Sequence, residues 1–321
     1  MNNLKRTIIL LAQQEGFDIV GISPPKISNP EIFINWLESG YCADMRYMNR
    51  NVDKRLNPSK LMSEVKSIIC LGISYYQRIE TLYNEDNLQK NAIDEKQSRK
   101  GRIAMYAWGQ DYHIVLKKKL HQLADKIKKI LGRDFRYRAF VDSAPVLETI
   151  LAEQAGLGWI GKNSCLVNKK LGSFFFLCEL FVDFELPTDK PAKNYCGQCR
   201  KCIDACPAGA IVAPKIVDAR KCISYLTIEH KGKFSEQQAK IIGNWIFGCD
   251  ICQNVCPFNR KAKPTMLNEF RELILGPTID VNEILHWSEE EYLSRTKGSA
   301  AERASIEQWK RNAKILTKNT S

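Results

Sequence analysis

The chain has 321 residues, of which 44% are hydrophobic and 26% charged, an ordinary composition for a globular protein with room for one large and one small domain. Its longest apolar run, residues 174–182, is interrupted by Glu179 and cannot span a bilayer, and the run at residues 8–12 is too short for a signal peptide. We therefore expect a cytoplasmic protein without a membrane partner, and the twelve cysteines suggest a reducing compartment.

The 48 basic residues exceed the 36 acidic ones and give a formal net charge of +12. Residues 114–140 hold nine Lys or Arg against two Asp. A second basic group near the C-terminus comprises Lys297, Arg303, Lys310, Arg311, Lys314 and Lys318. This pattern favours a polyanionic partner such as nucleic acid, and the alternative is a set of plain solvated helix faces.

Helices and strands alternate along the first 190 residues. Apolar periodicity predicts helices ending near Gly16, at residues 31–38, from residue 114 onward, and at 146–156. In the basic helix the apolar face comprises Leu116, Leu120, Leu123, Ile127 and Ile130. Strands of buried type are predicted at residues 17–23, 67–74, 136–141, 165–167 and 172–184. The alternation predicts an α/β domain over residues 1–190, within an overall fold that mixes α/β and α+β character.

The remaining segments are distinguished by composition. Residues 77–101 are polar and lack periodicity, which we interpret as a long mobile loop. The proline-bearing linker 186–191 leads into a cysteine-rich domain over residues 191–262. The last part, residues 263–321, is predicted to be helical, with a capping box at Ser288 and Glu291 and a hydrophobic staple from Trp287.

The cysteine-rich segment carries the most specific pattern of the chain. Two runs ending in Cys-Pro have the spacing with which bacterial ferredoxins bind [4Fe-4S] clusters, and the cysteine before each proline ligates the other cluster. By this rule one cluster is held by Cys196, Cys199, Cys202 and Cys256. The second is held by Cys206, Cys222, Cys249 and Cys252. The alternatives are a zinc site, which usually takes separated cysteine pairs, and a disulfide framework, which belongs to small secreted domains.

The other four cysteines, Cys42, Cys70, Cys165 and Cys178, lie in apolar surroundings and are expected to be buried. The chain has neither a Gly-x-Gly-x-x-Gly fingerprint nor a Walker A loop, so neither nucleotide cofactor is indicated. Asp111 and His113 partly match the Asp-x-His-x-x-Gly motif of one class of cobalamin-binding domain, but Leu116 replaces the glycine.

Taken together, the motifs resemble the epoxyqueuosine reductase family over about residues 50–300. The resemblance is carried by the cysteine set and by residues 106–113 (YAWGQDYH), 141–148 (VDSAPVLE), 152–163 (AEQAGLGWIGKN), 172–177 (GSFFFL), 220–227 (RKCISYLT) and 248–257 (GCDICQNVCP). It implies an enzyme that uses two [4Fe-4S] clusters and a base-off cobalamin, bound between the α/β domain and the ferredoxin-like domain. Its substrate would be epoxyqueuosine at the wobble position of tRNA, which it reduces to queuosine.

The resemblance also implies roles for individual residues. Asp142 matches the family's proton donor, and such a role needs a carboxyl whose pKa is raised by burial. Without the family, Asp142 reads as a cap of the following helix and His113 as a structural histidine. Tyr112 and His113 match companion residues of the active site.

Positions matching those that line the cobalamin are Arg55, Ala104, Asp142, Leu166, Leu177, Ser224, Cys249 and Asp250. For Leu166 and Leu177, burial in a strand core is the alternative.

The basic helix and the C-terminal basic group would contact tRNA phosphates, with Lys162, Lys231 and residues 99–102 near the same face. We expect a monomer that receives electrons from a flavodoxin or ferredoxin. Many relatives continue into a helical-repeat domain, so this chain is expected to be a short member or one relying more on its core for tRNA. The alternatives are a reductive dehalogenase-like enzyme, a ferredoxin-type electron carrier and a zinc-binding nucleic-acid protein.

Overall fold

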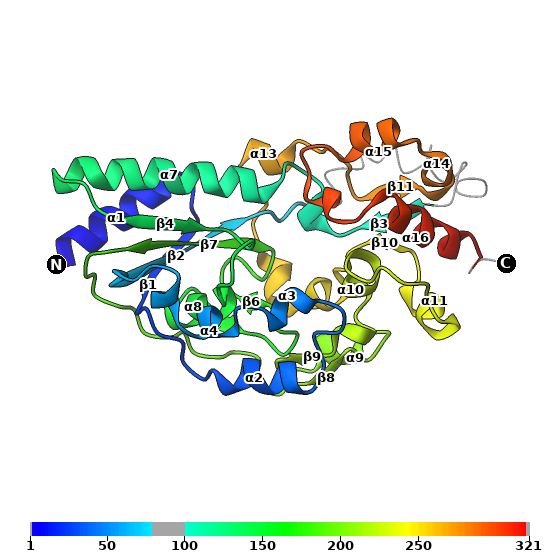
Figure 1. Cartoon of the computed structure of the whole chain (residues 1–321), viewed down its shortest axis with the longest axis horizontal. Coiled ribbons are helices and arrows are strands. Elements are labelled where there is room, and N and C mark those ends of the chain that lie inside the picture. Colours follow the sequence, from blue (N-terminus) through cyan, green and yellow to red (C-terminus); the bar gives the residue numbers. More distant parts are fainter. Residues whose placement is uncertain (1, 79–99, 319–321) are drawn as a thin grey trace.

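The computed structural model describes residues 2–78 and 100–318, so most of the loop predicted at residues 77–101 lies outside the described residues. The molecule is elongated, with a four-stranded sheet and its helices toward one end and the C-terminal helices toward the other (Figure 1). Across the described residues, no helix is both long and apolar enough to cross a membrane.

The main sheet has the strand order β1-β2-β7-β4, and every neighbouring pair is antiparallel. Its strands are β1 (Ile19–Ser23), β2 (Ser67–Ser74), β7 (Phe175–Val182) and β4 (Tyr137–Phe140). All eight residues of β2 are buried, because helices cover both faces of the sheet. The expected mixture of helices and strands is therefore present, and the strand directions make this layer α+β.

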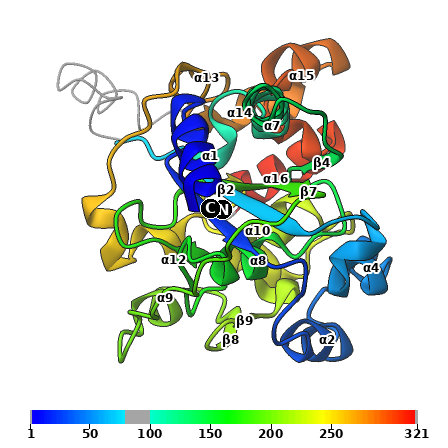
Figure 2. The same ribbon diagram turned by 90° about the vertical axis from the view of Figure 1, so that its left-hand side faces the viewer.

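Helices cover the sheet from both sides, as the two views show (Figures 1 and 2). On one face lie α1 (Asn2–Gln14) and α7 (Tyr112–Leu131), and on the other lies α8 (Glu148–Gln154). Asp111 is the N-cap of α7, and its side chain accepts the His113 N–H. The C-cap is Gly132, whose backbone lies in the left-handed region that glycine favours. Four of the five predicted core residues of α7 are buried, but Ile130, in the last turn, is 48% exposed.

A three-stranded sheet, in the order β10-β3-β11, connects distant parts of the chain. Its strands are β10 (Trp245–Phe247), β3 (Lys100–Ile103) and β11 (Thr278–Asp280). β3 pairs parallel with β10 and antiparallel with β11. Each strand thus comes from a different one of the three segments into which the sequence divides.

The remaining strands are short pairs: β5 (Trp159–Ile160) with β6 (Leu166–Val167), and β8 (Ile211–Ala213) with β9 (Ile216–Val217). The remaining helices are α2 (Glu31–Glu38), α3 (Arg46–Asn49), α4 (Val52–Leu56), α9 (Lys201–Asp204), α10 (Ile223–Ile228), α11 (Glu236–Ile242), α12 (Ile251–Asn254), α13 (Asn268–Arg271), α14 (Val281–His286), α15 (Glu289–Thr296) and α16 (Ile306–Lys318). The predicted capping box is present at Ser288 and Glu291, and Trp287 packs on Tyr292 with ring centroids 6.3 Å apart, which confirms the staple.

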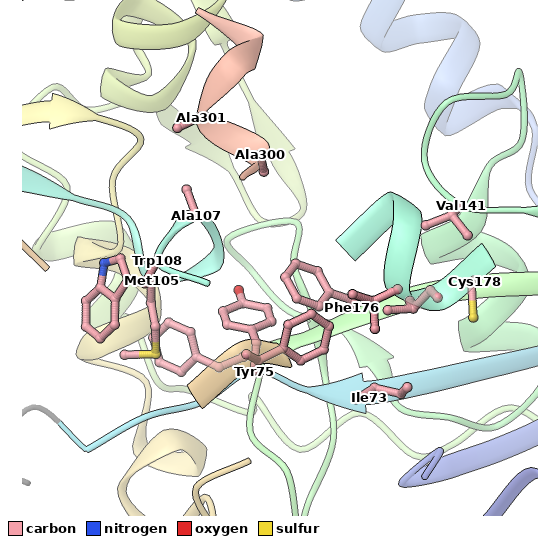
Figure 3. Packing of buried hydrophobic residues seen from close by; sticks show 14 of the residues in the cluster. Ile73, Tyr75, Met105, Ala107, Trp108, Val141, Phe176, Cys178, Ala300 and Ala301 are labelled. Atoms are coloured by element: carbon pink, nitrogen blue, oxygen red, sulfur yellow. The ribbon is translucent and has the colours of Figure 1, made fainter. Parts of the chain in front are cut away.

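The largest hydrophobic core continues from the main sheet into the C-terminal half. Figure 3 shows Tyr75 and Phe176, at the end of the main sheet, near Met105 and Trp108 of the segment that follows β3. The Tyr75 and Phe176 rings lie 4.3 Å apart, and Ala300 and Ala301 extend the same core. This continuous packing fixes the sheet relative to the cysteine-rich and C-terminal segments, and the candidate site lies where these parts meet.

Candidate functional site

A cavity of about 1090 Å³ opens between the main sheet and the cysteine-rich segment. Its wall includes Tyr112, His113 and Asp142 and also Cys222, Ser224 and Tyr225. Ligand pockets commonly measure about 300–1,000 Å³, so this cavity suits a large ligand. Its wall mixes aromatic and aliphatic side chains with a few polar groups, as binding sites for organic cofactors do.

Asp142 occupies the centre of the polar group in this wall. The Tyr112 hydroxyl donates a hydrogen bond of 2.6 Å to Asp142 Oδ2, and His113 Nε2 lies 3.6 Å from the same oxygen. The backbone of Asp142 has φ +50°, in the left-handed region that few non-glycine residues adopt. Helix α8 begins at Leu147 without a side-chain cap, so the alternative of a helix-capping Asp142 is wrong.

The electrostatics of this group place the proton on histidine. Burial lowers the pKa of His113, but hydrogen bonds with Asp111 and Asp142 outweigh it and raise the pKa to about 9. Burial raises the pKa of Asp142, but hydrogen bonds from His113 and Tyr112 hold it below its ordinary value. The expectation of a raised pKa for Asp142 is therefore wrong for this arrangement, because the sequence does not reveal its two donors. At neutral pH Asp142 is a carboxylate beside a protonated His113.

Two further carboxyls, those of Glu148 and Glu179, interact with Asp142. Glu148 Oε1 accepts the backbone N–H of Asp142 at 2.5 Å, and the neighbouring Glu179, fully buried in β7, has no hydrogen-bond partner for either carboxyl oxygen among the residues that the structure describes. Burial and the charge of Asp142 raise the pKa of Glu148 to about 8, and burial raises the pKa of Glu179 well above its ordinary value. The charge of Glu148 adds to the effect of burial on the pKa of Glu179, so Glu148 interacts both with this buried carboxyl and with the loop that carries Asp142.

Arg55 brings a buried guanidinium to the cavity wall, and one of its N–H groups has no hydrogen-bond partner among the described residues. Its side chain is 8% exposed and donates to the Tyr47 carbonyl at 3.3 Å. The Arg55 Nε is buried without a hydrogen-bond partner among the residues that the structure describes. A buried donor without a partner is costly, so this position favours a ligand that offers an acceptor such as a carboxamide or phosphate oxygen.

The effects of the cysteines on one another's pKa values show which thiols lie close together. After burial, the pKa of Cys256 is affected by Cys196 and Cys199 and that of Cys222 by Cys252 and Cys206, as in the predicted ligand sets, whereas that of Cys202 is affected by Cys252 before Cys196 and Cys256. Within residues 2–78 and 100–318, no three His, Cys, Asp or Glu side chains converge on a single metal ion.

The other cysteines differ from one another. Cys42, Cys70 and Cys178 are buried, as expected. Cys165 is only half-buried and is hydrogen-bonded to Cys252, so it belongs to the surroundings of the second group of ligands.

Only some of the predicted cobalamin-lining residues lie at the cavity. Arg55, Asp142 and Ser224 line it. The residues that are not part of its wall are Ala104, Leu166, Leu177, Cys249 and Asp250.

These five residues have local structural roles. Leu166 is buried and Leu177 partly buried in the core of the sheet, which matches the strand-core alternative. Asp250 is 4% exposed and accepts the Met105 N–H at 2.7 Å. Ala104 packs with Ile223 and Trp245, next to Cys249.

Several residues of the cavity wall were not among the predicted cofactor-binding or catalytic residues. Tyr47, Tyr106 and Arg303 line the cavity, and Arg303 is held by Glu229 at 2.9 Å and stacks 5.5 Å from the Tyr47 ring. The sequence indicates Arg303 only as part of a basic group. Glu148 lies inside a quoted motif, six positions after Asp142, but the sequence pattern indicates neither its hydrogen bond to the Asp142 N–H nor its raised pKa.

The basic helix begins at the cavity, because Tyr112 and His113 form its first turn. Lys117 and Lys118 are exposed one to two turns further on, whereas the Lys119 ammonium donates to the Glu15 carbonyl at 2.9 Å. Lys162 also has a structural contact, since its ammonium donates to the carbonyls of Gly197 and Cys199 at 2.8 and 2.9 Å. Lys117 and Lys118 are thus the lysines of this helix best placed to contact a ligand at the cavity mouth.

Comparison with known families gives two matches. Residues 195–259 match the family described as 4Fe-4S double cluster binding domain. Residues 55–143 match the family described as "Epoxyqueuosine reductase QueG, DUF1730".

Curated relatives cover nearly the whole chain. An epoxyqueuosine reductase of Pseudomonas aeruginosa is 46% identical over 303 residues, which are 94% of this chain and 81% of the relative. That of Leadbetterella byssophila is 42% identical over 317 residues, 97% of this chain and 98% of the relative.

Solved structures agree in fold. A crystal structure of epoxyqueuosine reductase with an epoxyqueuosine-modified tRNA-Tyr stem loop superposes with a TM-score of 0.86 at 28% identity, covering 99% of this chain and 82% of that one. The Bacillus subtilis enzyme, with an aspartate-bearing catalytic loop swung out of its active site, gives a TM-score of 0.88 at 28% identity with the same coverage.

Proposed function

The chain belongs to the epoxyqueuosine reductase family, and from this we propose that it reduces epoxyqueuosine in tRNA to queuosine, the last step in making this modified base. The reaction takes two electrons and two protons per epoxide, releases the epoxide oxygen as water, and leaves an alkene. The observation that carries the proposal is the cavity that joins Asp142 and its proton donors to Cys222 of the second cluster set. This reading is favoured over a reductive dehalogenase-like enzyme and over a ferredoxin-type carrier.

The proton at the departing oxygen is assigned to the group around Asp142. His113 holds it at neutral pH, and Asp142 Oδ2 lies within 3.6 Å of His113 Nε2 and 2.6 Å of the Tyr112 hydroxyl. A ligand in the cavity displaces water from Asp142, and loss of water favours the neutral carboxyl over the carboxylate. The proton then passes from His113 through Asp142 to the departing oxygen.

We propose that the cavity also binds cobalamin, since its volume and the unpartnered Arg55 Nε fit a large ligand rich in carboxamide acceptors. Arg55 would hold a polar substituent of this cofactor, and Ser224 would contact it from the side of Cys222. When bound, cobalamin supplies cobalt-centred electron transfer to the epoxide. Asp142, Tyr112 and His113 face the same space and orient the substrate there.

The electron route is assigned to the two [4Fe-4S] clusters of the double cluster domain. Cys206, Cys222, Cys249 and Cys252 would hold the cluster next to the cavity, because Cys222 lines the wall. Cys196, Cys199, Cys202 and Cys256 would hold the outer cluster. The clusters would supply electrons one at a time, with the outer set of ligands toward the surface and the inner set toward the cavity.

The proposed macromolecular substrate is tRNA carrying epoxyqueuosine in its anticodon loop. An unstacked loop base can enter a cavity, while phosphates of the stem meet cationic side chains outside it. Lys117 and Lys118 at the start of α7 are exposed and close to Tyr112, so they are assigned to the phosphates. We further propose a cytoplasmic monomer that receives electrons from flavodoxin or ferredoxin.

Metal analysis and turnover test the proposal together. Anaerobically purified protein, incubated with cobalamin and desalted, should contain about eight iron and one cobalt per chain, as two cubane clusters and one corrinoid require. The same protein should convert epoxyqueuosine to queuosine in an isolated tRNA. Iron without retained cobalt would point to the electron carrier, and zinc in place of iron would contradict the cluster assignment.

A further inference from the structure

The two cluster sites face different surroundings. The cavity wall contains Cys222 of the inner set and none of Cys196, Cys199, Cys202 and Cys256. The outer loop, residues 196–199, is open to solvent, since Gly197 and Gln198 between the two cysteines are exposed. If electrons leave the protein's clusters at the cavity, as the proposed function requires, they enter most directly at this outer loop.

We propose that the surface around the outer loop is the docking site of a small acidic electron-transfer protein. This outer-cluster surface comprises Tyr195 with the basic residues Lys169, Lys170, Lys193, Arg200, Lys201, Arg260 and Lys261, all of them exposed. The inference deepens the proposed function by assigning the place at which reductant is supplied.

An aromatic pair joins this surface to a cluster ligand. The Trp159 Nε1–H donates to Cys196 Sγ at 3.3 Å, and the Trp159 ring meets the Tyr195 ring edge-on at 5.3 Å between centroids. Trp159 is 1% exposed, whereas Tyr195 is 46% exposed. An exposed tyrosine over a buried tryptophan offers a partner a flat apolar contact next to the ligand, and aromatic residues are enriched at the centres of interfaces.

The charges around this pair are almost all of one sign. Residues 190–204 contain four Lys or Arg and a single acid, Asp204, which is paired with Arg200 at 3.5 Å. The Lys169 ammonium lies 5.3 Å from the centre of the Tyr195 ring. Arg260 lies two residues after Phe258, whose ring centroid is 4.8 Å from that of Trp159. Apolar contact within a positive rim is the complement of an acidic partner with an apolar centre.

The chemistry favours a redox protein over RNA at this place. The cavity that would receive a tRNA base contains no residue of the outer set, and the exposed lysines nearest to its mouth are Lys117 and Lys118 on α7. Helices α7 and α9, the latter next to the outer loop, lie far apart in both views (Figures 1 and 2). A positive surface that leads to a cluster ligand serves electron entry, where opposite charge accelerates encounter by 10-fold or more.

The test measures cluster reduction directly, without tRNA. Reduced acidic flavodoxin is mixed anaerobically with the cluster-loaded protein, and the loss of cluster absorbance is followed by stopped flow at low and high salt. The double variant Lys169→Glu/Lys193→Glu should be reduced at least about 10-fold more slowly at low salt, and the difference should shrink at high salt. The matched control is Lys129→Glu, which reverses an exposed charge at the far end of α7.

Dithionite reduction and tRNA affinity separate the explanations. Both should be the same in the double variant as in the parent chain. An unchanged flavodoxin rate would overturn the proposal, as would an equal slowing with dithionite or a loss of tRNA affinity alone. Because cluster reduction is read without epoxyqueuosine, a failure of turnover would bear on the proposed function and leave this result standing.

Discussion

We expect replacement of Glu148 by leucine to release the loop that carries Asp142. Glu148 Oε1 accepts the Asp142 N–H at 2.5 Å, and this hydrogen bond joins helix α8 to the loop. Asp142 has φ +50°, a backbone conformation that costs a non-glycine residue about 1–2 kcal/mol, although aspartate tolerates it better than most. Leucine is close to glutamate in size but offers no acceptor, so the strained conformation loses its support.

The magnitude follows from the hydrogen bond. This hydrogen bond lies at the exposed side of the loop, where water can replace the lost acceptor, so its net contribution is about 0.5–1.5 kcal/mol. A free-energy difference of this size changes an equilibrium by roughly 2- to 10-fold. If the reactive form is the loop conformation in which Asp142 contacts Tyr112 and Glu148, the turnover rate of Glu148→Leu should fall by a similar factor. Glu148→Gln keeps an acceptor oxygen and resembles the protonated carboxyl.

The assay is single-turnover conversion of epoxyqueuosine to queuosine in tRNA, read by mass spectrometry of the digested nucleosides. Iron content and tRNA affinity are measured on each variant, so that a misfolded protein is recognised. Glu148→Gln should stay within a few-fold of the parent chain near pH 7. Full activity of Glu148→Leu would refute the role of the acceptor, and equal loss in both variants would show that the charge, not the acceptor, matters.

Three further predictions concern the same face of the molecule. Asp142→Asn should retain its iron and lose turnover by roughly 100-fold or more, the usual size of a general acid–base contribution; full turnover would remove Asp142 from proton transfer. Lys117→Ala/Lys118→Ala should weaken tRNA binding and make the salt dependence of log K shallower by about 0.7–0.9 for each phosphate that the variant no longer neutralises, as titrations at several salt concentrations will show; an unchanged slope would place these lysines outside the tRNA interface. Because the pKa of Glu148 is raised from 4.5 to about 8, its contribution to stability is complete below pH 4.5 and is lost as the pH rises through 8. Between pH 6 and pH 9 the free energy of unfolding, measured with urea, should therefore fall less in Glu148→Gln than in the parent chain. An equal fall in both proteins would contradict the raised pKa.

The sequence predicts well where structure and chemistry are local. Strand β2 is predicted over its full length, residues 67–74, because eight buried residues in a row leave no polar interruption. The capping box depends on Ser288 and Glu291, three positions apart, and is present in the structure. The cysteine spacing agrees with the match of residues 195–259 to the 4Fe-4S double cluster binding domain. Family resemblance brings Asp142, Tyr112 and His113 together, and the structure places them in direct contact.

What the sequence does not reveal depends on contacts between distant segments. The ionised state of Asp142 follows from donors on α7, 29 and 30 positions earlier, and no pattern near Asp142 encodes them. Strands β3, β10 and β11 have three or four residues each and gain their pairing only from one another, so local propensity cannot detect them. The family resemblance assigns Leu166 and Leu177 to a ligand, although their immediate strand context already indicates burial.

The three-stranded sheet has a consequence for the order of events during synthesis. β3 pairs with β11 through Lys100 and Asp280, so this ladder closes only after about 180 intervening residues have left the ribosome. Helix α16 then adds Asn312, whose side-chain amide donates to the carbonyls of Thr227 and Ile246 at 2.9 Å. The segment between Cys222 and Cys249 is thereby held by helix α16, which leaves the ribosome after it. Delivery of iron and sulfide to a settled inner site is thus a late event, and a chain interrupted before residue 278 would present its cysteines on an unsupported segment.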